Sequence, residues 1–292
     1  PDGDTGTNMA LTLESVAKDL ASARTMTEVC GAIAKGSLMG ARGNSGVITS
    51  QILRGIVDVC GSLEEIGPDD LIRALRQAAD AAYQAVLRPV EGTILTVVRE
   101  TAEALEAHGA GRSLGEVLEA ACEAAEASVQ RTPDLLPVLR DAGVVDAGGR
   151  GFTLFLASFR EVVTGIPVPE PAVVTTPVLV ERHLAGDDVA GLRYEVMFLL
   201  EAHDSTITGF KEAWGAVGDS IVIVGGDGLW NCHVHTNDIG AAIEAGIDAG
   251  RPSSIRVTDL FEEAEEHAWV TESSGGGGQA PPARVETAIV AV

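Results

Sequence analysis

The sequence predicts an all-α bundle of antiparallel helices followed by a smaller α+β domain. Three observations lead to this prediction. From Met9 to about Gly165 apolar residues recur at helical spacing, divided by short Gly or Pro stretches. Four prolines then fall within TGIPVPEPAVVTTPV (164–178), a composition that favours an extended linker. After this stretch, runs rich in β-branched residues alternate with helical patterns.

The first unit is expected to contain seven helices and one short turn, and no strand. In LIRALRQAADAAYQAVL, for example, Leu71, Ala78 and Val86 share one face at a period of about 3.6 residues, which is typical of a helix packed in a bundle. The connections are short, so neighbouring helices are expected to run antiparallel. The expected helices span residues 8–23, 26–38, 45–60, 69–87, 93–108, 114–130 and 148–163, with the turn at 134–141.

The second unit is expected to mix strands and helices. LRYEVMFLLEA (192–202) and SIVIVGGDGLWNCHVHTND (220–238) have the composition of strands, and the Gly-Asp-Gly in the second predicts a hairpin turn. A further strand is expected in RPSSIRVTDL (251–260). Helices are expected near 205–215 and 239–249.

These patterns divide the chain into five segments. They are a helical domain (1–165), a Pro-rich linker (166–178), an α+β domain (179–270), a Gly/Pro linker (271–284) and the start of a further domain (285–292). The last segment, VETAIVAV, is typical of a strand and has no partner strand near it in the chain. We therefore expect the sequence to be a fragment, truncated at the C-terminus and also at the N-terminus, where a motif rich in functional residues opens the chain.

Composition excludes some partners. The 292-residue chain carries 43 acidic and 20 basic residues, a net charge of −23, so neither nucleic acid nor an anionic membrane is an expected partner. No apolar run approaches the ~20 residues that a membrane span needs, and a cytoplasmic location is expected. The four cysteines show no CxxC spacing and are expected to be reduced core residues. A phosphorylated nucleotide remains possible if divalent cations bridge it to the protein.

The opening stretch PDGDTGTN is the first candidate site. Asp2 and Asp4 can direct two carboxylates to one side, where they repel each other unless a cation lies between them. Thr5, Thr7 and Asn8 offer hydroxyl, amide and backbone donors at the start of a helix, where free N–H groups favour phosphate. An acidic, Gly-rich turn that merely caps the helix is the alternative.

Three further stretches also place Gly, Asp, Ser or Thr at the start of a helix. In ARGNSG, the backbone at Asn44, Ser45 and Gly46 can hold phosphate oxygens, although the GK[ST] ending of a Walker A loop is absent; a helix–helix turn with a Ser cap is the alternative. In EGTILT, Thr93 can contact a nucleotide or cap the helix, and in VVDAGGRG, Asp146 and Gly148 precede an apolar helix. One such loop is ordinary; four in one helical domain indicate a site at one end of the bundle.

Together, PDGDTGTNM, GARGNSGVITSQILRG, EGTILTVVRE and GVVDAGGRG resemble the nucleotide-binding domain of the dihydroxyacetone kinase L-subunit type, an eight-helix barrel. With the α+β domain that bears HVHTND, nearly the whole chain resembles the A component of bacterial fatty acid kinase. The resemblance implies that Asp2 and Asp4 hold a pair of Mg²⁺ ions against the phosphates of ATP. It also implies that Asn44, Ser45 and Gly46 contact the phosphates.

In the same family, segments that match Thr93 and Asp146–Gly148 enclose the nucleotide. The implied reaction transfers the γ-phosphoryl group of ATP to the carboxylate of a fatty acid, which a separate binding protein presents, and yields an acyl phosphate. A homodimer is expected. A dihydroxyacetone-type kinase subunit shares the first domain and is one alternative; a regulatory protein that binds ATP without turnover is another.

The second domain raises the question of zinc. His233 and His235 alternate on a strand and face the same side. The resemblance implies a zinc site made of two such histidines and a cysteine from the earlier strand. At the position taken to match that cysteine, this sequence has Arg193, which cannot be a ligand, and Cys232 is expected to face the other way. Two imidazoles alone make a weak site, so zinc stays open against a structural or substrate-contacting role for the histidines.

Overall fold

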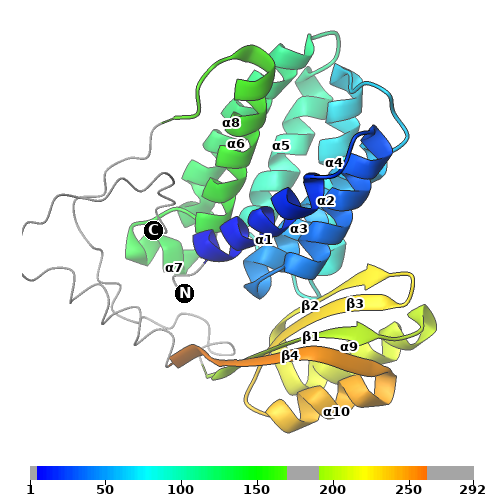
Figure 1. Ribbon diagram of the computed structural model, residues 1–292. Coiled ribbons are helices and arrows are strands. Elements are labelled where there is room, and N and C mark those ends of the chain that lie inside the picture. The colour runs from blue at the N-terminus through cyan, green and yellow to red at the C-terminus, as the bar shows by residue number, and fades with distance from the viewer. Residues whose placement is uncertain (1–4, 170–190, 262–292) are drawn as a thin grey trace, which may run out of the picture.

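The computed structural model describes residues 5–169 and 191–261. Eight helices come first, and an α+β unit with a four-stranded antiparallel sheet follows (Figure 1). Asp2 and Asp4, most of the expected Pro-rich linker and both segments after residue 270 lie outside the described residues. The helices of the first unit are α1 (Thr5–Leu20), α2 (Met26–Gly40), α3 (Gly43–Cys60), α4 (Pro68–Ala85), α5 (Ile94–His108), α6 (Leu114–Leu135), α7 (Pro137–Ala142) and α8 (Ala147–Thr164).

The helix pattern of the sequence is confirmed, with two differences at the ends. Helix α1 begins at Thr5, three residues earlier than expected, so Thr5 and Thr7 lie inside the helix and not in a loop before it. Helix α6 continues to Leu135, through Pro133. Proline has no N–H to offer Val129, but the hydroxyl of Thr132 donates to that carbonyl at 2.7 Å, which explains why the helix does not stop there.

The helical unit is built around a large apolar core, with a smaller buried cluster between α2, α3 and α4. Helices α4, α5, α6 and α8 supply most of the large core, with small residues where helices approach closely. At Gly55 of α3, a Cβ atom would lie 2.5 Å from the Cα atom of Ala78 in α4, so the two helices pack backbone to backbone there. None of the helices among the described residues is long and apolar enough to cross a membrane.

The second unit is a sheet with helices on one face. Strands β1 (Tyr194–Glu201), β2 (Gly218–Gly226), β3 (Leu229–Thr236) and β4 (Arg251–Asp259) have the order β2-β3-β1-β4. Helices α9 (Ile207–Val217) and α10 (Ile239–Ala249) cover the face away from the helical unit (Figure 1). Phe198, Phe210 and Trp214 form the centre of that core, with ring centroids 4.6 to 6.2 Å apart.

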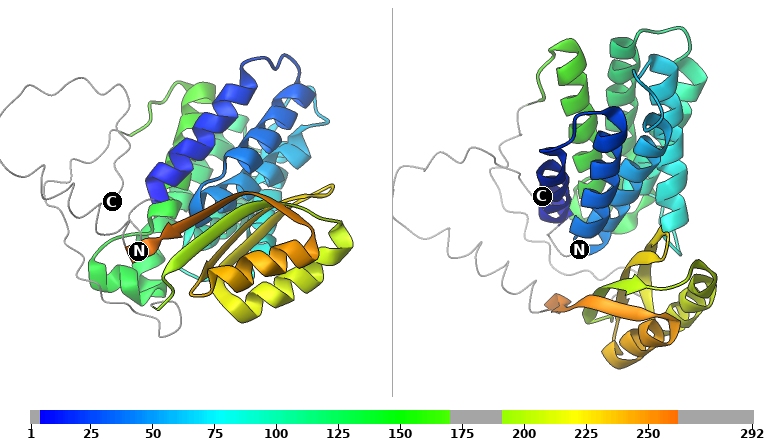
Figure 2. Two further views of the ribbon diagram at one scale, coloured as in Figure 1. Left: turned by 60° about the horizontal axis from the view of Figure 1, so that its bottom comes forward. Right: turned by 45° about the vertical axis from the view of Figure 1, so that its right-hand side comes forward.

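The other face of the sheet lies against the end of the bundle where α3 begins (Figure 2). The chain leaving α4 pairs with the outer edge of β2: Val86 forms a bridge with Val222, and the amide of Leu87 donates to the carbonyl of Ile221 at 3.1 Å. An ion pair of 3.2 Å joins Arg88 to Asp219 beside this contact. The two units therefore share a continuous hydrogen-bonded and apolar interface.

Candidate functional site

The starts of α1, α3, α5 and α8 meet at one end of the bundle. The hydroxyl of Ser45 in α3 reaches the carbonyl of Thr5 in α1 at 3.5 Å. Helices α1 and α8 touch at Met9, whose sulfur would lie 2.7 Å from a Cβ atom on Gly151. The carboxylate of Asp146 joins α8 to the amide of Ile94 in α5. The expectation that the four motifs gather is thus confirmed for the described part of each.

The start of α3 presents uncapped backbone amides. Arg42 occupies the N-cap position, and its side chain makes no capping hydrogen bond. Gly43 has a φ of 54°, a backbone conformation that favours glycine. Gly46 must be small as well, because a Cβ atom there would lie 2.6 Å from Oγ1 of Thr12 in α1. Free amides and the positive end of the helix dipole together suit a phosphate group.

Asn44 carries a second signal at the same place. Its side-chain oxygen Oδ1 is buried and has no hydrogen-bond partner among the described residues. A buried polar atom left without a partner costs free energy, so its retention needs an explanation. An amide oxygen is a hard ligand of the kind that Mg²⁺ accepts. The orphan oxygen therefore fits a metal–phosphate group lying at the start of α3.

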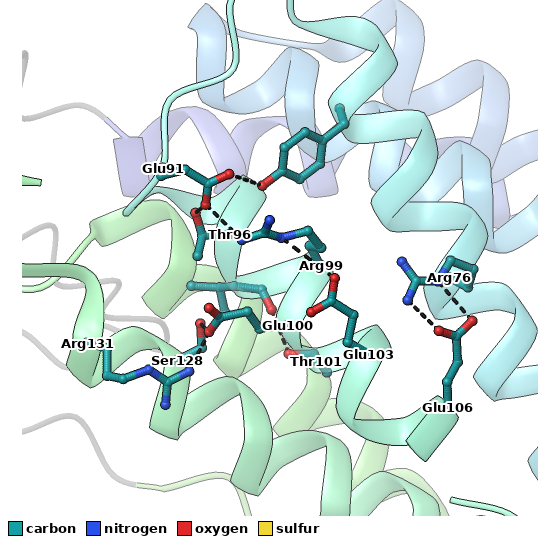
Figure 3. A network of polar contacts seen from close by, with 12 residues as sticks. Arg76, Glu91, Thr96, Arg99, Glu100, Thr101, Glu103, Glu106, Ser128 and Arg131 are labelled. Atoms are coloured by element: carbon teal, nitrogen blue, oxygen red, sulfur yellow. Dashed lines mark hydrogen bonds and ion pairs between the residues drawn. The ribbon is translucent and has the colours of Figure 1, made fainter. Parts of the chain in front are cut away.

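The start of α5 is held by a network around Glu91, shown in Figure 3. The carboxylate of Glu91 accepts hydrogen bonds from the hydroxyls of Tyr83 at 3.0 Å and Thr96 at 2.7 Å, and from the guanidinium of Arg99 at 2.8 Å. Thr96 also accepts a hydrogen bond from the amide of Gly92 at 2.9 Å. Burial and the hydrogen bond to Glu91 raise the pKa of Tyr83 to about 12.

Thr93 and Thr96, one turn apart at the start of α5, have different roles. Thr96 is fully buried and committed to the network around Glu91, so it is a structural residue. Thr93 is half-buried at the N-cap of α5, where it makes no side-chain cap and donates its hydroxyl to the carbonyl of Val90 at 2.8 Å. In α5, as in α3, the side chain of the N-cap residue accepts no hydrogen bond from the first backbone amides of the helix.

Asp146 has a structural task that the sequence did not reveal. Its carboxylate caps α8 by accepting from the amide of Gly149 at 2.6 Å, and it also takes hydrogen bonds from Ile94 and Gly148. Burial raises the pKa of Asp146 above its usual range, although these amides act in the opposite direction. A Cβ atom on Gly148 would lie 3.2 Å from Cβ of Ile94, so glycine lets α5 and α8 approach.

At the start of α1 the contacts are sparse. The carbonyl of Asn8 accepts from the hydroxyl of Thr12 at 2.7 Å, and Thr7 is exposed. Asp2 and Asp4 immediately precede Thr5 but lie outside the described residues, so their part in the site stays a prediction. What the structure shows is a converging set of helix starts rich in N–H and hydroxyl donors, a set suited to a polyanion.

A second polar group lies on the sheet face turned toward the bundle. Glu195, His233 and His235 offer ligand atoms that all lie within 4.8 Å of one another. Nδ1 of His233 is 3.0 Å from Oε1 of Glu195, and the two imidazole centroids are 5.0 Å apart. His233 is fully buried, and apart from the contact of Nδ1 with Glu195 neither of its ring nitrogens has a hydrogen-bond partner among the described residues.

The protonation of this group follows from its surroundings. Burial of the Glu195 carboxylate favours its neutral form, but the close contact with His233 and the positive charge that the two histidines carry when protonated outweigh burial and lower the pKa of Glu195. An ionised carboxylate beside two imidazoles is a ligand set used by zinc, and the unpartnered Nε2 would gain a partner if a metal were bound. The residues therefore fit a metal ion.

Sequence reasoning considers Arg193 alone as the match for a third ligand, and the structure offers Glu195 of strand β1 as a candidate instead. Arg193 is turned away: its Nε and a terminal nitrogen lie 2.7 Å and 2.6 Å from Asp259. Glu195, two residues further along β1, is in register with His235 of β3. Sequence reasoning missed Glu195 because it compared one position and did not pair the two strands. Cys232 does lie in the core on the opposite face, where burial raises the pKa of its thiol.

Comparisons with known proteins agree with both units. A family model described as the DAK2 domain matches residues 1–161, and one described as the middle domain of FakA-like fatty acid kinase proteins matches residues 191–267. Protein YloV of Bacillus subtilis is 35% identical over 312 residues, covering 100% of this chain and 55% of the relative. An uncharacterized protein of Staphylococcus saprophyticus is 34% identical over 311 residues with the same two coverages. The chain spans about half the length of the curated relatives it matches.

Proposed function

The chain belongs to the DAK2 domain family and carries a FakA-like fatty acid kinase middle domain, and from this premise we propose that it is an ATP-dependent kinase component. It transfers the γ-phosphoryl group of ATP to the carboxylate of a fatty acid held by a separate binding protein, and releases an acyl phosphate. The observation that supports this most is the meeting of four helix starts, two of them with uncapped amides, at one end of the bundle.

The described residues support the nucleotide part in detail. The uncapped amides at the start of α3 bind phosphate oxygens, and the hydroxyls of Ser45 and Thr93 lie at the starts of α3 and α5. Asp146 keeps the starts of α5 and α8 together, so this part of the proposed site is formed before the nucleotide arrives. Phosphoryl transfer requires positioning and charge neutralisation more than covalent chemistry, and this arrangement supplies positioning.

Metal ions supply the neutralisation. Asp2, Asp4 and the orphan oxygen of Asn44 are the residues that would hold Mg²⁺, which neutralises the phosphate charge when it is bound. Divalent cations between protein and nucleotide also reconcile the net charge of −23 with the binding of a polyanion. The acidic composition and the donor-rich helix starts thus support the same proposal.

Zinc belongs to the proposal as a second metal. Glu195, His233 and His235 match the two imidazoles and one carboxylate found in many zinc sites with an open fourth position. Glu195 is two residues from Met197, which packs against the bundle, and the two histidines alternate with Cys232 and Val234 of the opposite face, so all three lie on the sheet face turned toward the bundle. We propose zinc as a resident metal of the middle domain, separate from the metals that accompany ATP.

The decisive experiment measures phosphoryl transfer by the full-length protein, with Mg²⁺, ATP labelled at the γ-phosphate, and a fatty-acid-binding protein loaded with fatty acid. Hydroxylamine converts an acyl phosphate to a stable hydroxamate, which identifies the product. Asp2→Asn and Asp4→Asn should each reduce the rate about a hundredfold or more, because they remove metal ligands. Asp19→Asn, at an exposed position on α1, is the matched control.

The outcomes separate the candidates. Hydroxamate formation that depends on both Mg²⁺ and the loaded partner supports the proposal. Phosphorylation of dihydroxyacetone in place of the fatty acid would identify the other kinase type, and ATP binding without turnover would identify a regulatory protein. Full activity in both aspartate variants would overturn the metal assignment.

A further inference from the structure

The connection between α2 and α3, which leads into the proposed phosphate-binding amides, rests on the sheet of the middle domain. Helix α2 ends at Gly40 and α3 begins at Gly43, so only two residues separate them. Nδ2 of Asn231, on β3, donates to the carbonyl of Leu38 in the last turn of α2 at 2.9 Å. The side chain that makes this contact is almost completely buried, since Asn231 is 4% exposed.

This connection has little support of its own. The last carbonyls of any helix have no amide partner within the helix, and that of Leu38 takes its partner from the other domain. Arg42 at the N-cap of α3 makes no side-chain capping bond, and Gly43 has the conformational freedom of a glycine at φ 54°. The local sequence therefore leaves the direction of the α3 amides weakly determined.

Apolar contacts with the sheet complete the support. Ala41 and Val47, on either side of the α3 start, are 8% and 0% exposed. They belong to one buried cluster with Met197 of β1 and with Val222 and Val224 of β2. These sheet residues lie on the face that Figure 2 shows turned toward the bundle. The sheet thus holds the connection between α2 and α3 in two ways, by the hydrogen bond from Asn231 and by the apolar contacts of Ala41 and Val47.

We propose that Asn231 is a positioning residue for nucleotide binding, and that the middle domain serves as the platform on which the phosphate-binding connection of the helical domain is set. In this role Asn231 acts through the carbonyl of Leu38 and the backbone that follows. The proposal rests on the proposed function for its nucleotide, but the contact itself concerns the shape of the connection. Those two parts can be tested separately.

The test compares the full-length protein with Asn231→Ala and Asn231→Asp. Asn237→Ala is the matched control, because Nδ2 of Asn237 also donates to a backbone carbonyl, that of Gly191 at 2.7 Å, within the middle domain. Amide hydrogen exchange of residues 38–47 is measured without nucleotide, and Mg–ATP affinity is measured by titration calorimetry. Asn231→Asp preserves the shape of the side chain while removing the donor, so it serves if the alanine variant is poorly folded.

The expected results follow from the loss of one buried hydrogen bond. Exchange of residues 38–47 should become faster in both Asn231 variants, and the Kd for Mg–ATP should rise about fivefold. In turnover assays the KM for ATP should rise while kcat at saturating ATP changes little, a split that a general loss of stability would not produce. Asn237→Ala should leave exchange in 38–47 and the ATP affinity unchanged.

Other outcomes are equally informative. Unchanged exchange and unchanged ATP affinity in folded Asn231 variants would overturn the proposal. If the wild-type protein binds no Mg–ATP, the proposed function fails, but faster exchange in 38–47 of the Asn231 variants would still establish the sheet as the platform for this connection. If Asn237→Ala has the same effects as Asn231→Ala, the effect is general destabilisation and the positioning role is rejected.

Discussion

Oε1 of Glu195 lies 3.0 Å from Nδ1 of His233, on adjacent strands of one sheet and on the face turned toward the helical bundle. A carboxylate at this distance orients the buried imidazole. It also places a third ligand atom within 4.8 Å of those of His233 and His235. The contact turns a pair of histidines into a group with the composition of a metal site.

We expect the purified full-length protein to contain zinc in a ratio of about one per chain. Glu195→Ala or His233→Ala should lower the zinc content at least tenfold. Losing even a residue that only supports a metal ligand typically lowers metal affinity by about tenfold or more. Metal analysis by mass spectrometry after extensive dialysis measures this. Glu201→Ala, an exposed glutamate at the end of β1, should retain the metal. Zinc-free wild-type protein, or full zinc in Glu195→Ala, would show that the three residues form only a hydrogen-bonded cluster.

Asn44 offers a direct test of the start of α3. Asn44→Ala removes the buried oxygen that has no protein partner among the described residues, so the fold should lose little stability while Mg–ATP affinity falls about tenfold. Thermal unfolding and calorimetric titration separate these two effects. Gln51→Ala, further along the same helix, controls for any change in α3. Unchanged ATP affinity in Asn44→Ala would mean that the orphan oxygen has another partner.

The fold could be predicted from the sequence because its determinants are local. Apolar periodicity, Ser113 as a cap and the Gly-Asp-Gly turn each act within a few residues, and the resulting elements lie within about one turn of their expected bounds. The largest error is the end of α6, which was expected at residue 130 and lies at Leu135, beyond Pro133. The hydroxyl of Thr132 provides the compensation, and side-chain compensation of this kind is not visible in a periodic pattern.

The site was predicted less completely, for a physical reason. Four Gly- and Asp-rich helix starts could be recognised one by one, and packing brings them together as expected. Glu195 depends on the register between β1 and β3, and Asn231 meets Leu38 across 193 residues of chain. Such contacts follow from tertiary packing, which a single sequence does not specify.

The Glu91 network predicts a late tyrosine titration. The pKa of Tyr83 is raised from 10.0 to about 12, first by burial and then by the hydrogen bond to Glu91. Because the folded state holds the proton more tightly than the unfolded state, the stabilisation is fully present below pH 10 and is lost as the pH rises through about 12. Ultraviolet absorbance of tyrosinate during alkaline titration should show this step, and Tyr83→Phe should remove it.

Glu91→Gln serves as the partner variant in that titration. It keeps the burial of Tyr83 but removes the carboxylate charge, so the late step should move part of the way toward the ordinary value and not all of it. The absence of a late step in the wild-type protein would contradict the network. A step that stays at the wild-type position in Glu91→Gln would assign the shift to burial alone.

Asp146 should be required for the stability of the helical unit as well as for its proposed site. Asp146→Ala removes the cap of α8 and leaves the amides of Ile94, Gly148 and Gly149 without their acceptor. We expect a loss of about 2 kcal/mol in the free energy of unfolding, measured by chemical denaturation. Asp146→Asn keeps an acceptor oxygen and should lose less.

The pH dependence of unfolding adds a second criterion, because the pKa of Asp146 is raised in the folded state. The stabilisation linked to its proton is present below the usual aspartate range and is lost as the pH rises through the raised value. The free energy of unfolding of Asp146→Asn should therefore lie closest to that of the wild-type protein at neutral pH and fall furthest below it in acid. The opposite result would be a wild-type protein that gains stability relative to Asp146→Asn as the pH rises. In that case the amides would affect the pKa of Asp146 more than burial does, and Asp146 would be a charged cap at the starts of α5 and α8.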